Sequence, residues 1–157
     1  TMGLRYFNVF GPRQDPNGPY AAVIPLWAAQ MLRGEPCVIN GDGETSRDFC
    51  YVANAVQANL RAALVEEPAA LNQVFNVAVG QRTTLVQLHA LLAAALTHLD
   101  PALRIVPPVK RGFREGDVRH SLADIGKAAS LLGYAPSHDV RAGLQDAAAW
   151  YVAQEKK

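Results

Sequence analysis

The sequence predicts an α/β protein, and three observations support this prediction. Short runs rich in apolar and aromatic residues alternate with longer segments whose apolar residues recur at helical spacing. Of the 157 residues, 50% are hydrophobic and 18% are charged, which is sufficient for one folded core. Internal repeats and low-complexity linkers are absent from the sequence. We therefore expect residues 1–157 to form a single unit.

The charge and the cysteine content argue against several kinds of protein. The formal net charge of +1 gives no overall attraction to nucleic acid or to a membrane surface. No stretch approaches the roughly 20 apolar residues that span a bilayer, and no signal peptide is visible. Cys37 and Cys50 lie in apolar runs outside any metal-type or redox-type spacing, which favours reduced core thiols over a disulfide. We expect a cytoplasmic protein without nucleic-acid, membrane or metal partners.

The N-terminal part is expected to hold a strand, a loop and a helix. Apolar and aromatic residues crowd residues 3–9, which predicts a buried strand. The glycines and prolines of residues 11–19 predict a loop. Helical spacing predicts a helix over residues 20–33, with Pro25 in its first turn and Gly34 just beyond its end. The chain enters the first strand without a preceding turn, so we expect a segment of a longer protein.

Two further strands are predicted over residues 36–40 and 47–52. The glycines of residues 41–44 predict a hairpin turn between them. Capping spacing that starts at Asn54 predicts a helix that runs to about Val65. The alternation of strands and helices thus continues.

Another strand and a capped helix follow. Residues 74–78 are apolar and predict a strand. Thr84 and Gln87 have the spacing of a capping box, and the leucines that follow form one helical stripe, which predicts a core helix. Residues 105–106 are a candidate strand, and residues 107–117 are a loop rich in arginine and glycine.

The C-terminal part is predicted to be helical. Asp124 is a candidate cap for a short helix that ends at Gly133, a residue type common just after a helix. Residues 134–137 predict a turn, and apolar spacing predicts a last amphipathic helix over residues 140–154.

Polar or aromatic residues near the ends of these elements are the first candidate ligand-binding groups, because α/β proteins bind ligands where strands and helices meet loops. Asn8 lies inside an apolar strand and needs a hydrogen-bond partner, which is either the backbone or a ligand. Trp27 follows the small residues at the start of its helix, and it forms either an apolar ligand wall or part of the core.

Charged side chains form the other candidate groups. Arg47 begins a strand, where its guanidinium could hold a phosphate. The alternative is an ion pair with Asp48 or Glu44. Arg114 and Asp117, separated by a glycine turn, could bind a phosphate and a ribose hydroxyl, or could belong to a solvated charge run.

Motifs typical of catalysis and cofactor binding are missing from these residues. The sequence has no Gly-x-x-Gly-x-x-Gly fingerprint and no Tyr-x-x-x-Lys pair. Its serines lack the context of a nucleophile elbow. Of the four histidines, only His120 lies beside a candidate group, and no metal-ligand spacing joins them. We therefore assign no catalytic residue and no metal ligand.

Taken in order, the candidate groups resemble the extended short-chain dehydrogenase/reductase family, and within it the UDP-N-acetylglucosamine 4-epimerase group. The resemblance covers nearly the whole chain. Residues 14–25 resemble the subgroup that handles UDP-N-acetylhexosamines and their uronic acids. The other segments that carry the resemblance are residues 4–11, 40–43 and 46–49.

The resemblance implies a UDP-sugar site with a role for each residue. Asn8 would contact the diphosphate and the sugar. Ala22 and Val23 would contact the uracil, and Trp27 would lie close by. Asn40 would reach the nucleoside.

The remaining roles belong to charged and aromatic residues. By the same resemblance, Arg47 and Arg114 would neutralise the diphosphate, and Asp117 would hold ribose hydroxyls. Tyr6 and Phe7 would lie near the nicotinamide of NAD, largely through their backbone.

Two positions depart from the family pattern. The family often has a lysine where Leu26 stands and a base-stacking aromatic residue where Val38 stands. Loss of a stacking ring weakens base binding by about 1–3 kcal/mol if nothing replaces it.

The resemblance further implies the fold and the chemistry. The chain would be the C-terminal substrate-binding portion of an extended Rossmann-type fold, without the Gly-rich half that binds NAD. In the family, a Tyr-x-x-x-Lys pair takes the proton of the sugar 4-hydroxyl as hydride passes to NAD, so this chain would only bind and orient. We expect an inactive part of a UDP-N-acetylglucosamine 4-epimerase-like enzyme. The alternatives are a UDP-uronate epimerase or decarboxylase, a nucleotide-sugar dehydratase, and a non-catalytic binding module.

The expected partners follow from the same resemblance. In the family, the strand over residues 3–9 pairs within the parallel sheet of the other half. Alone, it would be an exposed apolar edge. Besides a UDP-sugar, we therefore expect the N-terminal half or a second copy of the chain as a partner.

Overall fold

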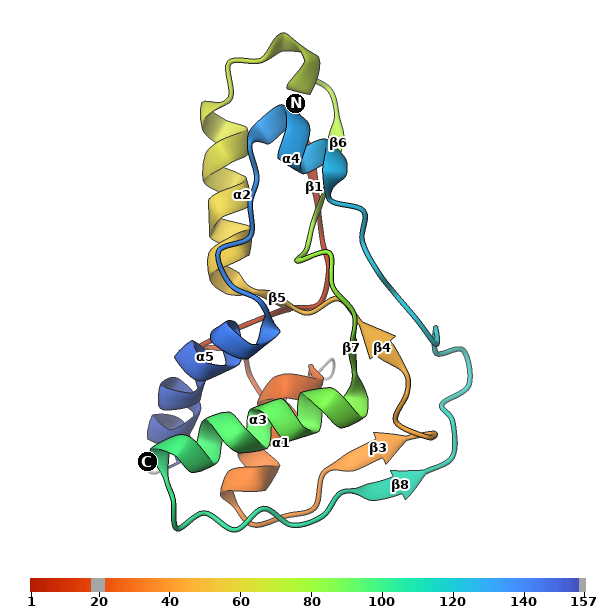
Figure 1. Ribbon diagram of the computed structural model, residues 1–157, viewed down its shortest axis with the longest axis vertical. Coiled ribbons are helices and arrows are strands. Elements are labelled where there is room, and N and C mark those ends of the chain that lie inside the picture. The colour runs from red at the N-terminus through yellow and green to blue at the C-terminus, as the bar shows by residue number, and fades with distance from the viewer. Residues whose placement is uncertain (18–21, 156–157) are drawn as a thin grey trace.

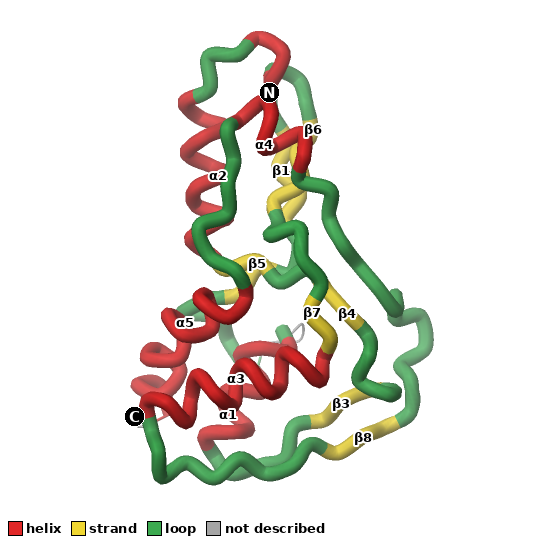
Figure 2. The backbone as a smooth tube through the Cα atoms, in the orientation of Figure 1, coloured by secondary structure: helices red, strands yellow, loops and turns green. Residues whose placement is uncertain are grey.

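The structure is a computed structural model that describes residues 1–17 and 22–155. Its elements alternate along the chain (Figures 1 and 2). In order they are β1 (Gly3–Tyr6), β2 (Val9–Phe10), α1 (Val23–Leu32), β3 (Val38–Asn40), β4 (Ser46–Arg47), β5 (Cys50–Tyr51), α2 (Val52–Leu64), η1 (Pro68–Ala70), β6 (Val74–Val77), β7 (Thr83–Thr84), α3 (Leu85–Leu99), β8 (Val109–Arg111), α4 (Gly126–Leu132) and α5 (Val140–Glu155).

The strands form four pairs, of which three are parallel. These are β1 with β6, β2 with β5, and β3 with β8, whereas β4 and β7 run antiparallel. Parallel pairs join strands that are distant in sequence and have helices between them, as in α/β proteins. The predicted α/β class is therefore confirmed.

The elements gather at two ends of an elongated molecule (Figure 1). One end holds β1, β6, α2 and α4 around a cluster that includes Phe75 and Val77. The other end holds α1, α3, α5, β3 and β8 around a larger cluster that includes Trp27 and Leu92. The short β2–β5 pair lies between the two ends. The residues that form the site belong mainly to the second end.

Two of the local signals for helix ends in the sequence are confirmed. The Thr84 side chain accepts a hydrogen bond from the Gln87 backbone N–H, and the Gln87 side chain accepts one from Thr84, so the capping box is complete. Gly133 ends α4 in the left-handed conformation, with φ 62°.

Four predictions about strands are wrong. The strand predicted over residues 47–52 divides into β4 and β5, and Val52 begins α2. The strand predicted over residues 3–9 divides into β1 and β2, because Asn8 adopts φ 35° and turns the chain between them. The glycines of residues 41–44 do turn the chain, but they form no hairpin, since β3 and β4 pair with β8 and β7 instead of with each other. The strand predicted at 105–106 lies later, at Val109–Arg111.

Two predicted helix caps are also wrong. Asn54 lies inside α2, which begins at Val52 with no side-chain cap. The residue directly before α4 is Ile125, while Asp124 accepts only the Gly126 backbone N–H, at 2.8 Å. The Asn54 side chain instead connects α2 to the turn before α5.

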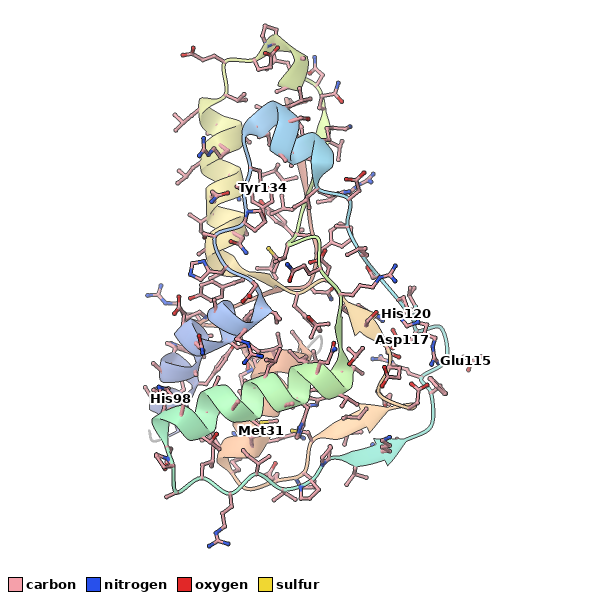
Figure 3. All side chains as sticks on the ribbon, viewed as in Figure 1. Met31, His98, Glu115, Asp117, His120 and Tyr134 are labelled. Carbon is pink, nitrogen blue, oxygen red and sulfur yellow. The ribbon has the colours of Figure 1, made fainter. Side chains whose placement is uncertain are left out.

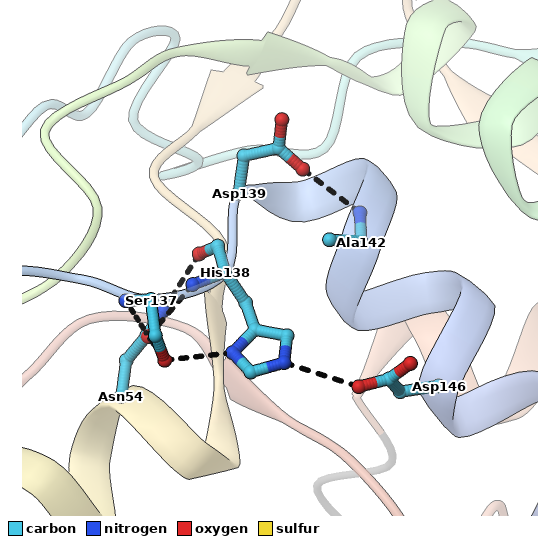
Figure 4. Close-up of polar contacts among 6 residues, drawn as sticks. All are labelled: Asn54, Ser137, His138, Asp139, Ala142 and Asp146. Atoms are coloured by element: carbon cyan, nitrogen blue, oxygen red, sulfur yellow. Dashed lines mark hydrogen bonds and ion pairs between the residues drawn. The ribbon is translucent and has the colours of Figure 1, made fainter.

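The buried Asn54 side chain holds the turn before α5 (Figure 4). Its Oδ1 accepts the backbone N–H groups of Ser137 and His138 at 2.9 and 3.2 Å, and its Nδ2 donates to the His138 carbonyl at 2.8 Å. His138 continues the network through its ring, which contacts the Ser137 hydroxyl at 2.8 Å and the Asp146 carboxylate at 3.1 Å. Since buried polar groups need partners, this network fixes α5 relative to α2.

Asp48 performs a similar role near the site. Its buried carboxylate accepts the backbone N–H groups of Val79, Gly80 and Ala123 at 3.0, 2.9 and 3.3 Å. Two segments that are distant in sequence are thereby attached to the residue that directly follows Arg47 at the end of β4. Asp48 is consequently unavailable for the ion pair with Arg47 that the sequence left open.

Candidate functional site

A cavity with a volume of about 510 Å³ holds most of the predicted site residues. It lies between α1, the β3–β8 pair, β4 and the long segment that leads from β8 toward α4. Its lining comprises Asn8, Val23, Leu26, Trp27, Gln30, Val38, Asn40, Thr45, Arg47, Phe49, Leu85, Arg111, Arg114 and Asp117.

One wall of the cavity is a face of α1. Val23, Trp27 and Gln30 follow one another at spacings of four and three residues, so they share one side of the helix. Trp27 is 2% exposed, and its ring meets the ring of His89 edge to face at 5.8 Å. Trp27 is therefore both a core residue and part of the cavity wall, which combines the two interpretations left open by the sequence.

The β3–β8 pair forms a second wall. Val38 and Asn40 lie two residues apart and face the cavity, whereas Ile39 between them is buried. Asn40 pairs in register with Arg111, so their side chains share a face of the ribbon. Arg111 thereby extends the Asn40 wall by one strand.

Charged side chains form the third wall. Arg47 makes an ion pair with Asp117 and donates to the Ser46 carbonyl at 2.9 Å. The segment that carries Asp117 and His120 runs beside β4 (Figure 3). Two contacts hold it there: the Ser46 N–H donates to the Arg119 carbonyl at 2.9 Å, and the Ser46 hydroxyl contacts His120 Nδ1 at 2.9 Å. Contacts with Ser46 therefore hold both the Arg47 side chain and the segment that carries Asp117.

A second ion pair supports the outer end of this segment. Arg119 pairs with Asp42 in the turn after β3 and lies over the Phe113 ring at 5.3 Å. The pKa of the Asp42 carboxyl is lowered, first because it accepts a hydrogen bond from the Glu44 backbone N–H and second because it accepts one from Arg119. Gly41 also fits this arrangement, since an added Cβ would lie 2.3 Å from the Phe113 ring.

Seven of the eight residues predicted to bind substrate line this one cavity, namely Asn8, Val23, Trp27, Asn40, Arg47, Arg114 and Asp117. The eighth, Ala22, directly precedes α1 and lines an adjoining cavity of about 90 Å³ with Asn8 and Phe49. The neighbouring residues 20 and 21, which the sequence placed in the same helix start, lie outside the described residues. The structure thus brings these groups together, while their binding role stays a prediction.

Tyr6 and Phe7, the two residues predicted to lie near the cofactor, lie outside the 510 Å³ cavity. Tyr6 ends β1 and is 51% exposed, and its hydroxyl contacts the Asn59 side chain of α2 at 2.9 and 3.1 Å. Phe7 donates its backbone N–H to the Val77 carbonyl at 3.0 Å. Neither residue lines the 510 Å³ cavity.

Several lining residues were missed from the sequence. Gln30 could have been found from its helical spacing to Trp27. Arg111 was assigned to a loop, because the strand before it was placed too early, so its register with Asn40 could not be foreseen. The other lining residues that were missed are Thr45, Phe49 and Leu85. Leu26 and Val38, the two departures from the family pattern, also line the cavity, and these five residues add mainly apolar surface.

Residues 1–78 match the sequence model of the NAD dependent epimerase/dehydratase family. The structure of a UDP-glucose 4-epimerase from Thermotoga maritima, solved with UDP-glucose, superimposes with a TM-score of 0.84. It is 40% identical, over 98% of this chain and 46% of that chain. The chain belongs to the NAD dependent epimerase/dehydratase family.

Other family members are similarly related. The structure of a UDP-N-acetylglucosamine 4-epimerase from Methanobrevibacter ruminantium, in complex with UDP-N-acetylmuramic acid, is 40% identical with a TM-score of 0.85 over 98% of this chain and 46% of that one. A UDP-glucose 4-epimerase from Mycolicibacterium smegmatis is 36% identical over 87% of this chain and 41% of its own length. A UDP-N-acetyl-alpha-D-glucosaminuronate decarboxylase from Bacillus cytotoxicus is 30% identical over 94% and 45%. The chain thus spans less than half the length of these relatives.

NAD is the cofactor of this family. It accompanies, for example, the solved UDP-glucose 4-epimerase of Thermus thermophilus, which is 28% identical with a TM-score of 0.73 over 96% of this chain and 46% of that one. The residues of the present chain do not form a dinucleotide site of their own, because the sequence has no Gly-rich turn between a strand and a helix.

Among residues 1–17 and 22–155, no group of three or more His, Cys, Asp or Glu side chains could hold a metal ion. The helices in the same ranges are too short or too polar to cross a membrane.

Proposed function

We propose that this chain supplies the nucleotide-sugar-binding half of an NAD-dependent UDP-N-acetylglucosamine 4-epimerase-like enzyme. One observation carries the proposal: a single cavity combines an apolar wall, a polar strand end and three arginines. A nucleotide sugar has a flat base, a diphosphate and a hydroxylated sugar, which require these three kinds of surface.

The arrangement of the cavity supports an orientation for this ligand. The base and ribose would lie between the α1 face and the β3–β8 wall, near Asn40. The arginines would face the diphosphate, and Asn8 would face the sugar. Asn8 suits this position, because its left-handed backbone places a carboxamide at the end of β1, where open α/β sheets bind ligands.

The charges of the cavity match the charges of the ligand. A nucleoside diphosphate sugar carries two phosphate charges at neutral pH. The lining holds Arg47, Arg111 and Arg114 but only one carboxylate, Asp117, which leaves a formal surplus of two positive charges (three minus one). Because Asp117 already pairs with Arg47, the surplus lies on Arg111 and Arg114.

These residues bind and orient the substrate, and they do no chemistry of their own. When bound to the intact enzyme, NAD supplies the hydride acceptor and donor. Rigid placement of the sugar lowers the entropic part of the barrier. We therefore propose that the chain alone is inactive and that its partner is the family's NAD-binding half.

A related function is favoured by one of the comparisons. Because a UDP-N-acetyl-alpha-D-glucosaminuronate decarboxylase is also a relative, a decarboxylase or a uronate epimerase is the second candidate. Residues around the sugar would distinguish these enzymes, and most of them belong to the family's NAD-binding half. A non-catalytic binding module is the third candidate.

Thermal unfolding with added ligand tests the binding proposal. UDP or UDP-GlcNAc at about 100 times its Kd should stabilise the chain by about 2.7 kcal/mol, which corresponds to a rise in Tm of about 5–10 °C. Uridine, which has no phosphate, should produce a much smaller rise at the same concentration. An unchanged Tm with both nucleotides would exclude the binding proposal.

A longer protein that contains this chain tests the reaction. With NAD, it should invert C4 of UDP-GlcNAc, which NMR of the product sugar detects. Loss of carbon dioxide from a UDP-uronate substrate would instead support the second candidate, and loss of water would indicate a dehydratase.

A further inference from the structure

Gln30 carries an unexplained polar atom in the wall of the cavity. Its side-chain Oε1 is buried and has no hydrogen-bond partner among the described residues. Only His89 Nε2 shares this property there, and His89 does not line the cavity. Native structures leave few such atoms, because an unpaired buried acceptor loses its bonds to water without replacement. A carboxamide whose oxygen is unpaired, in the wall of a ligand cavity, can gain hydrogen bonds by turning toward a bound ligand.

The position of Gln30 indicates which part of the ligand it would meet. Gln30 lies one turn beyond Trp27 on α1, at the end of the helix that leads into β3. Val38 and Asn40 line the same cavity from β3, whereas Asn8 lies beyond the opposite end of α1. If a nucleotide sugar lies with its nucleoside at Asn40 and its sugar at Asn8, Gln30 lies at the nucleoside end. This orientation places the base about two turns along α1 from Ala22 and Val23, to which the resemblance assigned the uracil.

The chemistry of the carboxamide matches one edge of a pyrimidine base. A carboxamide offers an acceptor and a donor side by side. Uracil and thymine present an N3–H donor between two carbonyl acceptors, so the two edges can form a pair of hydrogen bonds. The terminal torsion of glutamine is soft, so a partial rotation about it can bring Oε1 to the cavity surface beside Nε2.

We propose that Gln30 is a specificity-determining residue that accepts a hydrogen bond from the base N3–H through Oε1 and donates one to a base carbonyl through Nε2. The proposal rests on the nucleotide-sugar function proposed above and assigns the base to an imide-bearing pyrimidine. It also explains how the base can be held although Val38 stands where the family often has a base-stacking aromatic residue. In this site, edge hydrogen bonds from α1 hold the base in place of a stacking ring on β3.

A cycle of one mutation and one ligand modification tests the proposal. Isothermal titration would measure Kd for UDP and for N3-methyl-UDP, which lacks the N3–H, with the wild-type chain and with Gln30→Met. Methionine keeps the length of the side chain and removes both hydrogen-bonding atoms. The wild-type chain should bind UDP about tenfold more tightly than N3-methyl-UDP, and Gln30→Met should bind the two ligands equally within about twofold.

Gln145→Met is the matched control. Gln145 is exposed on α5 and does not line the cavity, so this variant should keep the tenfold preference. The ligand-free Gln30→Met chain should unfold at the same temperature as the wild type or above it, because the substitution removes an unpaired buried acceptor. A marked drop in its Tm would reveal an internal partner for Oε1 and overturn the proposal.

The possible failures are distinguishable. Equal preference for UDP in the wild type and in Gln30→Met would overturn the role of Gln30 alone. Absence of UDP binding by the wild-type chain would overturn the proposed function, and the role of Gln30 with it.

Discussion

At the residue scale, the ion pair between Arg47 and Asp117 changes the electrostatics of the cavity. Both residues line it, yet each already has a partner of opposite charge. Arg111 also lines the cavity, and no carboxylate of the described residues pairs with it. A free guanidinium is therefore available where the resemblance assigned none, and it supplies part of the charge that a diphosphate requires.

Substitution of Arg111 tests this charge balance. Arg111→Gln should weaken binding of UDP by about three- to tenfold, because one cation is lost from a partly solvated site. The loss should shrink between 50 mM and 500 mM NaCl, since salt screens the interaction. Titration calorimetry measures both effects. Arg104→Gln, which changes an exposed arginine outside the cavity, should leave the Kd unchanged, and an equal loss in both variants would refute a local role for Arg111.

The two thiols allow a prediction about reactivity. Cys37 and Cys50 are free and fully buried, and burial raises the pKa of each thiol to about 11. At pH 8 only about one thiol in a thousand would be ionised, and the thiolate is the reactive form. Both should therefore resist Ellman's reagent in the native chain and react within minutes in 6 M guanidinium chloride. Fast reaction of one thiol without denaturant would show that its part of the core opens.

Much of the candidate site could be read from the sequence at this scale. Asn8 stands out as a polar residue inside an apolar strand, Arg47 as a cation at a strand start, and Asp117 as a carboxylate beside a glycine turn. The three residues share one cavity. Arg111 and Gln30 were missed for different reasons. Arg111 reaches the cavity through a strand register between distant segments, and the significance of Gln30 appears only from the lack of a partner in three dimensions.

At the scale of elements, some local signals were reliable, although the caps predicted at Asn54 and Asp124 were wrong, and the pairing between distant segments could not be predicted. The capping box at Thr84 and the glycine at position 133 act within one turn of helix, so the sequence contains all that defines them. The glycines at residues 41–44 suggested a hairpin on equally local grounds. The observed pairing of β3 with β8 depends instead on residues about 70 positions away, for which spacing alone gives no signal.

Asn54 shows how a single side chain can connect elements. Asn54→Ala would leave the Ser137 and His138 N–H groups and the His138 carbonyl without partners near a buried position. We expect a loss of about 2–4 kcal/mol in the free energy of unfolding in urea. Asn59→Ala, on an exposed part of the same helix, is the control and should cost less than about 1 kcal/mol. Similar losses for both would mean that α5 is held by its apolar contacts alone.

At the scale of the whole molecule, one surface is unusually apolar. Val52, Val56, Leu60 and Leu64 repeat every four residues along α2, with exposures of 36, 53, 58 and 77%. Beside α2 lies β1, whose only partner among the described strands is β6, so its other edge is unpaired. An apolar helix stripe next to a free strand edge favours association.

We therefore predict that the chain self-associates when no other partner is present. Sedimentation velocity should show a weight-average mass that rises with protein concentration. Leu60→Lys combined with Leu64→Lys should shift the chain toward monomer, because the two charges would be buried in the contact. Leu99→Lys changes an equally apolar residue of α3, 46% exposed, and should leave association unchanged. A wild-type mass that stays monomeric at all concentrations would mean that the stripe and the strand edge remain solvated, and a loss of association in Leu99→Lys would place the contact on another surface.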